Sequence, residues 1–122
     1  MMAYLNEEHE ERYKVLIKKL GLNYEDRERK ALFYLVAGNL DLYKQLDKIY
    51  DFKNQQLCCL TEDGQLDFSN IYTSSSSKAL LRLGIQLYNS GDDITVSETF
   101  RYLDADTAQI ALNAIKIRYK IN

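Results

Sequence analysis

The chain contains no proline, and glycine occurs at only five positions. These two residue types usually punctuate irregular loops and rigid linkers, so their scarcity predicts helices joined by short turns. A length of 122 residues is enough for one domain whose core needs neither a disulfide nor a metal. We therefore expect an all-α fold, a compact bundle of five or six helices, formed by residues 1–122 as a single domain.

Apolar residues at helical spacing indicate where the individual helices lie. Asn6 and Gly21 bracket a first helix, and a second runs from a cap at Asn23 through the apolar run 31–37 to Gly38. Because that run is apolar on every side, the second helix should lie at the centre of the core. The remaining helices are expected to begin at residue 39 or 41, at the serines 74–77, at Thr95 or Ser97, and at residue 106 or 107.

One segment, LCCLTEDGQLDF at residues 57–68, breaks the helical period. Two short mixed runs flank Glu62-Asp63-Gly64, and Asp-Gly is a common pair in tight turns. We expect a small hairpin or an irregular loop there, since two strands alone are only marginally stable.

The composition also bears on where the protein works. The longest apolar stretch, residues 31–38, is far shorter than the roughly twenty residues that a membrane span needs. The start MMAYLNEEHEE lacks the basic and then apolar order of a signal peptide. Cys58 and Cys59 are adjacent and too few for a disulfide framework, which indicates a reducing compartment. We expect a cytoplasmic protein with no membrane association.

The charge pattern disfavours nucleic acid as a partner. The net charge is -2, and acidic and basic residues are interleaved over the first thirty positions, as on a solvated helix surface. No broad basic face for a phosphate backbone is evident. An electrostatic contact with nucleic acid would require Lys116, Arg118 and Lys120 to share one face with Arg82 or Arg101.

The four serines at residues 74–77 allow three interpretations. Ser75 and Lys78 have the Ser-x-x-Lys spacing of acyl-transferring enzymes, but the Ser-Asp-Asn and Lys-Thr-Gly tripeptides of those enzymes do not occur. A cap formed by Ser76 or Ser77 fits the strong preference for serine at helix starts. A milder functional interpretation is an anion site formed by Ser75, Ser76, Ser77 and Lys78, because a helix N-terminus favours negative charge.

Metal and acid-base chemistry find little support in the sequence. His9 is the only histidine, and Tyr13 stands where a zinc-protease helix would need a second one. Cys58 and Cys59 with His9 lack the further soft ligands of a zinc site. We expect His9 on the exposed side of the first helix, and no catalytic residue, metal or cofactor.

Ten tyrosines and no tryptophan are the one compositional oddity. Tyrosine offers a large contact area with a polar tip, which favours it at binding surfaces. Tyr4, Tyr24 and Tyr72 lie outside the clear helical stripes. These three are the predicted partner-binding residues.

Four segments carry a resemblance to a known family: LNEEHEERY (5–13), FYLVAGNLDLYKQLDKIYDF (33–52), SSSSKALLRLGIQLYN (74–89) and FRYLDADTAQIALNAIKIRY (100–119). They resemble an uncharacterised family of small helical proteins from Gram-positive bacteria and their phages, a domain of unknown function. The resemblance covers most of the chain and rests on core-like segments. It implies a compact helical domain in a bacterial or phage cytosolic setting, and it brings no activity or site residues.

Two functional hypotheses follow. The first is a non-enzymatic interaction protein that binds another protein or a second copy of itself, and that in a phage would act on a host complex. The second is a small enzyme or an anion- or ligand-binding protein with a site near the serines 74–78 and the loop 53–73. Such a site would join Ser75 and Lys78 to Asp63 or Cys58 in one pocket.

Overall fold

The computed structural model describes residues 3–21, 26–89 and 94–121, and within them it confirms the expected helical bundle. A small antiparallel hairpin accompanies the helices. In chain order the elements are α1 (Glu7–Leu20), α2 (Arg27–Ala37), α3 (Leu40–Lys44), the 3₁₀ helix η1 (Leu46–Lys48), β1 (Tyr50–Asp51), β2 (Gln56–Leu57), α4 (Ser75–Asn89), α5 (Val96–Phe100) and α6 (Ala105–Tyr119).

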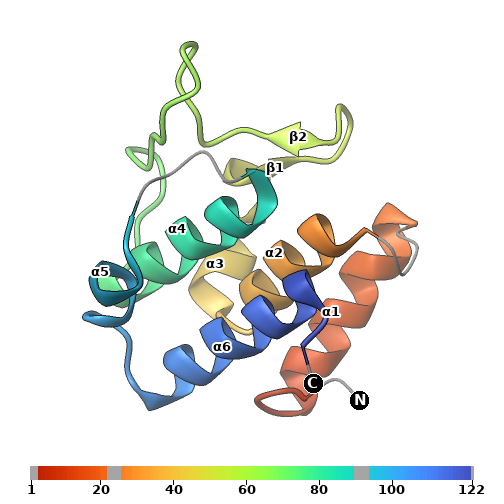
Figure 1. The fold of residues 1–122 in the computed structure, drawn as a ribbon. Coiled ribbons are helices and arrows are strands. Elements are labelled where there is room, and N and C mark those ends of the chain that lie inside the picture. The colour runs from red at the N-terminus through yellow and green to blue at the C-terminus, as the bar shows by residue number, and fades with distance from the viewer. Residues whose placement is uncertain (1–2, 22–25, 90–93, 122) are drawn as a thin grey trace.

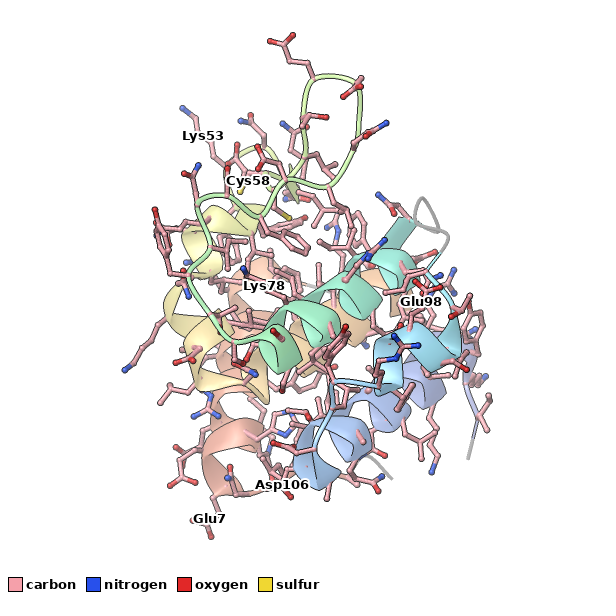
Figure 2. The ribbon with its side chains drawn as sticks, turned by 90° about the vertical axis from the view of Figure 1, so that its left-hand side faces the viewer. Glu7, Lys53, Cys58, Lys78, Glu98 and Asp106 are labelled. Carbon is pink, nitrogen blue, oxygen red and sulfur yellow. The ribbon has the colours of Figure 1, made fainter. Side chains whose placement is uncertain are left out.

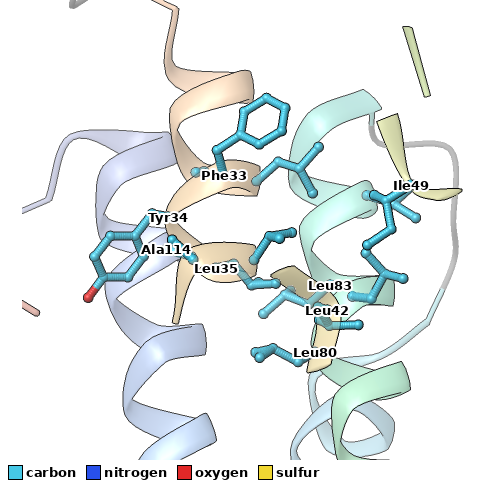
Figure 3. Close-up of a cluster of buried hydrophobic side chains, with 14 of the residues drawn as sticks. Phe33, Tyr34, Leu35, Leu42, Ile49, Leu80, Leu83 and Ala114 are labelled. Atoms are coloured by element: carbon cyan, nitrogen blue, oxygen red, sulfur yellow. The ribbon is translucent and has the colours of Figure 1, made fainter. Parts of the chain in front are cut away.

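Helix α2 lies at the centre of the bundle, between α4 and α6 (Figures 1 and 3). Helices α1 and α3 also pack against it. Every residue from Ala31 to Ala37 is completely buried. Since a helix that is apolar on all sides needs apolar neighbours on all sides, this arrangement confirms the position predicted from the sequence.

Side-chain caps determine where the helices begin. Asn6 caps α1 and Gly21 ends it, as the sequence predicts, and Gly21 adopts the left-handed conformation. Helix α2 begins after a cap at Asp26, while the expected cap Asn23 lies outside the described residues. Asp104 caps α6, so this helix starts slightly earlier than expected. Each cap satisfies a backbone amide that has no partner within its own helix.

Two glycines permit close packing between helices. A Cβ atom at Gly84 would lie 2.9 Å from Leu32 Cδ1, so α4 approaches α2 closely at this point. Helix α2 ends at Gly38 as expected, but in the right-handed conformation with φ of -80°. A Cβ atom there would lie 2.9 Å from Ile110 Cδ1 and 3.1 Å from His9 Cε1. Close packing therefore favours glycine at residue 38, in addition to its place at the helix end.

The region between α2 and α4 differs from the expectation. The third helix ends early, and the chain continues through η1 into the hairpin β1–β2, whose segment lies above one end of the bundle in Figure 1. Ile49 and Tyr50 are buried as their spacing predicts, but at the hairpin rather than on a continuous helix. Within the predicted hairpin at 57–68, an isolated bridge joins Leu60 and Leu66 on either side of Gly64. Local spacing favours a helix at residues 49 and 50, but their contacts with distant parts of the chain favour the hairpin instead.

Candidate functional site

A surface pocket of about 430 Å³ lies between the first half of α4 and the region of α5. Its polar lining residues are Ser75, Lys78, Arg82, Glu98 and Arg101. Three basic side chains and one carboxylate therefore line the pocket. Figure 2 shows Lys78 on α4 and Glu98 on α5.

The spacing of the α4 residues explains their shared position. Ser75, Lys78 and Arg82 stand at i, i+3 and i+7, which places them along one face of the helix. Leu80 and Leu83 belong to the opposite side and are buried in the core (Figure 3). The amphipathic pattern that packs α4 onto α2 thus also directs its polar face into the pocket.

Helix α5 is short but is held firmly at its start. Thr95 caps it by accepting a hydrogen bond from the Glu98 amide at 3.1 Å, and the Thr95 hydroxyl donates to Glu98 Oε1 at 3.0 Å. The buried Thr99 hydroxyl donates to the Thr95 carbonyl at 3.0 Å. Arg101 follows immediately after the helix. These bonds stabilise the start of α5, and Glu98 and Arg101 line the pocket together with residues of α4.

Lys78 and Arg101 are the two basic side chains of the pocket that can bind a ligand. Lys78 and Arg101 are exposed, and neither has an ion-pair partner within the described ranges. Arg82 lies in the same lining and is less exposed. Two like charges that approach a common pocket repel each other, and an anion between them would relieve that repulsion.

Of the predicted anion-site residues, the structure brings Ser75 and Lys78 into the pocket. Ser77 instead faces inward, where its hydroxyl accepts hydrogen bonds from Asn39 Nδ2 at 2.9 Å and from Ser74 Oγ at 3.2 Å. Ser76 is half-buried and does not line the pocket. The cap of α4 is Ser74, whose hydroxyl oxygen accepts from the Ser77 amide at 3.1 Å, so the assignment of the cap to Ser76 or Ser77 was wrong.

Neither Asp63 nor Cys58 lines this pocket, although the sequence paired them with Ser75 and Lys78. Cys58 lies in the segment that precedes α4 (Figure 2), and its thiol donates to the Asp47 carbonyl at 3.4 Å. Partial burial and nearby carboxylates raise its pKa. Burial raises the pKa of Cys59 to about 11. Both thiols therefore favour the protonated form, which is a weak nucleophile.

A model of a family of unknown function, DUF6075, matches residues 1–122. The chain belongs to this family. No curated protein and no solved structure matches it. The function of this DUF6075 member must therefore be inferred from its own geometry and chemistry.

His9 of this DUF6075 chain is buried, which corrects the expectation of an exposed residue. Its Nε2–H donates to the Tyr34 carbonyl at 2.8 Å, and its Nδ1 accepts the Leu5 amide at 3.0 Å. Burial lowers the pKa of the imidazole. The spacing of His9, Tyr13 and Leu16 at i, i+4 and i+7 contained the signal, because all three lie on the buried face of α1.

The three predicted partner-binding tyrosines differ in their surroundings. Tyr4 is half-buried, and its ring lies 5.4 Å from that of His9 and 6.0 Å from that of Tyr34, measured between centroids. Tyr24 lies outside the described residues. Tyr72 is 76% exposed. Of Tyr4 and Tyr72, the two that the structure describes, only Tyr72 has a largely exposed side chain.

The basic residues near the C-terminus of α6 do not join the pocket. Arg118 Nε donates to the Leu87 carbonyl at 2.8 Å, and its guanidinium lies 3.5 Å from the Glu28 carboxylate. Arg118 thus links α6 to the end of α4 and the start of α2. It serves the packing of this DUF6075 domain, and the pocket contains neither Lys116 nor Lys120.

Two further findings concern only the parts of the chain that the structure describes. There, no helix is both long and apolar enough to cross a membrane. In those same ranges, no three side chains of histidine, cysteine, aspartate or glutamate gather in a group that could hold a metal ion.

Proposed function

We propose that this protein is a non-catalytic binding domain whose pocket between α4 and α5 holds an anionic group. The observation that carries this proposal is that Lys78 and Arg101, on separate elements, line one pocket, and that neither has an ion-pair partner within the described residues. Charge-assisted hydrogen bonds from ammonium and guanidinium groups to an oxyanion are about twice as strong as neutral ones. The hydroxyl of Ser75 adds a neutral donor at the same edge.

The composition of the pocket favours binding over catalysis. Its described lining contains no histidine or cysteine. Its one carboxylate, Glu98, already accepts a hydrogen bond from Thr95. Lys78 is exposed, so its side chain can reach an anion in the pocket. These features suit Lys78 as an anion ligand.

The proposal is tested by titrating the ¹⁵N-labelled protein with inorganic phosphate and following amide resonances. We expect saturable shifts at residues 75–78 and at Arg101, and their loss in the double variant Lys78→Ala, Arg101→Ala. The double variant Lys44→Ala, Lys53→Ala removes the same charge away from the pocket and should bind as the wild type does. The proposal fails if no shift saturates, or if both double variants weaken binding equally.

A second function, binding of a protein partner, is favoured by the way Tyr72 is presented. The Tyr72 amide donates to Gln45 Oε1 at 2.9 Å, and Gln45 Nε2 donates to the Tyr72 carbonyl at 3.0 Å. Lys48 Nζ lies 5.3 Å from the centroid of the exposed ring. A tyrosine on a fixed backbone loses little conformational entropy on binding, and tyrosine is enriched at the energetic centres of interfaces.

The second function requires a partner that depends on this ring. We expect a stoichiometric partner in pull-downs from the native host, or a dimer in sedimentation experiments, with the wild type and with Tyr119→Ala as a control. The Tyr72→Ala variant should lose it. Capture by both variants alike would exclude the Tyr72 surface. If the chain comes from a phage, we propose that this partner is a host protein.

A further inference from the structure

The walls of the pocket are more apolar than a site for a bare inorganic anion requires. Phe68 enters from the segment before α4, and Tyr102 from the turn after α5. Ala79 and Ile94 complete this apolar part of the lining. A volume of about 430 Å³ falls within the range of small-molecule sites, and it greatly exceeds the roughly 30 Å³ that one water molecule occupies. The pocket therefore has room for a group attached to the anion.

We propose, building on the anion-binding function above, that the ligand is a small phosphate monoester that carries an aromatic or heteroaromatic ring. A phosphate monoester has a charge of about -1.5 to -2 near neutral pH. A dianion can therefore pair with both Lys78 and Arg101, which line the pocket from separate elements. The planar guanidinium of Arg101 suits two phosphate oxygens at once.

The distribution of charge in the pocket also gives the ligand an orientation. Glu98 repels a phosphate, so the phosphate binds on the side of Lys78 and Ser75, with Arg101 reaching it from the far wall. The ring of the ligand then lies against Phe68 and Tyr102, where offset or edge-to-face contacts are favourable. Glu98 is left to accept a hydrogen bond from a hydroxyl or amino group on the ligand.

The inference is tested by comparing phenyl phosphate with inorganic phosphate in the same amide titrations. A well-placed ring contact and the burial of its apolar area both favour the ligand that carries a ring, so we expect phenyl phosphate to bind roughly tenfold more tightly than inorganic phosphate. Tyr102→Ala should reduce the affinity for phenyl phosphate and leave that for inorganic phosphate unchanged. Tyr119→Ala is a matched control, because both tyrosines are 55% exposed. Tyr102→Phe should retain the preference.

The outcomes of these titrations separate the failure of the inference from the failure of the anion-binding function. Equal affinities for the two ligands would overturn the inference and leave the anion-binding function intact. Absence of saturable binding by either ligand would overturn both. If phenyl phosphate is preferred, phosphotyrosine and adenosine monophosphate identify the source of the ring: tighter binding of one assigns the pocket to phosphorylated tyrosine or to a nucleotide. Circular dichroism melting of each variant confirms that a loss of binding does not reflect unfolding.

Discussion

The buried imidazole of His9 makes the stability of this fold dependent on pH near neutrality. Nδ1 accepts the Leu5 amide, and Nε2–H donates to the Tyr34 carbonyl, so only the neutral ring satisfies both bonds. Burial lowers the pKa of His9 below its ordinary value of 6.5, and the nearby Arg12 lowers it further, against the opposing effect of the bond to Tyr34. Protonation would add a hydrogen to Nδ1, which could then no longer accept the hydrogen bond from the Leu5 amide.

The direction and size of the effect follow from proton linkage. With a lowered pKa in the folded state, the unfolded chain binds the proton more readily, so the full stability is present above pH 6.5. It declines as the pH falls through 6.5 toward the folded pKa. If His9 stays neutral in the folded protein, the loss between about pH 7.5 and about pH 5.5 is about 1.4 kcal/mol. The total free energy of unfolding of such a domain is on the order of 5–15 kcal/mol.

Urea unfolding followed by circular dichroism across this pH range measures the effect. His9→Gln is the matched variant, because its amide can still donate to the Tyr34 carbonyl but cannot titrate. We expect a lower but flat free energy of unfolding for His9→Gln, and a decline with falling pH for the wild type. No second histidine contributes in this range. Parallel curves for the two proteins, or a flat curve for the wild type, would refute the reasoning.

Three further changes test the packing and capping. Gly84→Ala places a Cβ atom 2.9 Å from Leu32 Cδ1, and the overpacking cost of about 1–3 kcal/mol should match or exceed the helix-propensity gain of about 1 kcal/mol; a clearly higher melting temperature would contradict this. Ser74→Ala should cost about 1 kcal/mol in urea unfolding and Ser76→Ala almost nothing, and the reverse order would contradict the observed cap. Tyr34→Phe removes a hydroxyl with two hydrogen-bond partners and should cost about 1–3 kcal/mol; an unchanged unfolding midpoint would show these bonds to be unimportant.

Much of the helical architecture could be predicted because its signals are local. The cap at Asn6 and the helix end at Gly21 act within a few residues of the chain, so the sequence alone locates them, and it limits the cap of α5 to Thr95 or Ser97. The apolar circumference of residues 31–37 likewise required a central position for α2. The third helix was predicted too long, because the burial of Ile49 and Tyr50 depends on the hairpin and the core around it.

The candidate site, in contrast, could be predicted from the sequence only in part. Ser75 and Lys78 could be predicted from their place at the start of a helix, but Glu98 and Arg101 could not, because their relation to α4 depends on how α5 packs. The burial of Ser77 has a similar origin, since its hydroxyl meets Asn39 from a distant part of the chain. Sequence spacing alone could not show which serines would face inward.

The sequence by itself determined that the fold is helical, which helix is central and approximately where the helices lie, because capping and periodicity act between near neighbours in the chain. The tertiary structure alone decided which hydrogen bonds the buried His9 makes, that a side chain at residue 38 would crowd Ile110 and His9, and that Lys78 and Arg101 share a pocket. Each of these depends on contacts between residues far apart in sequence. Such contacts are determined by how the helices pack as a whole.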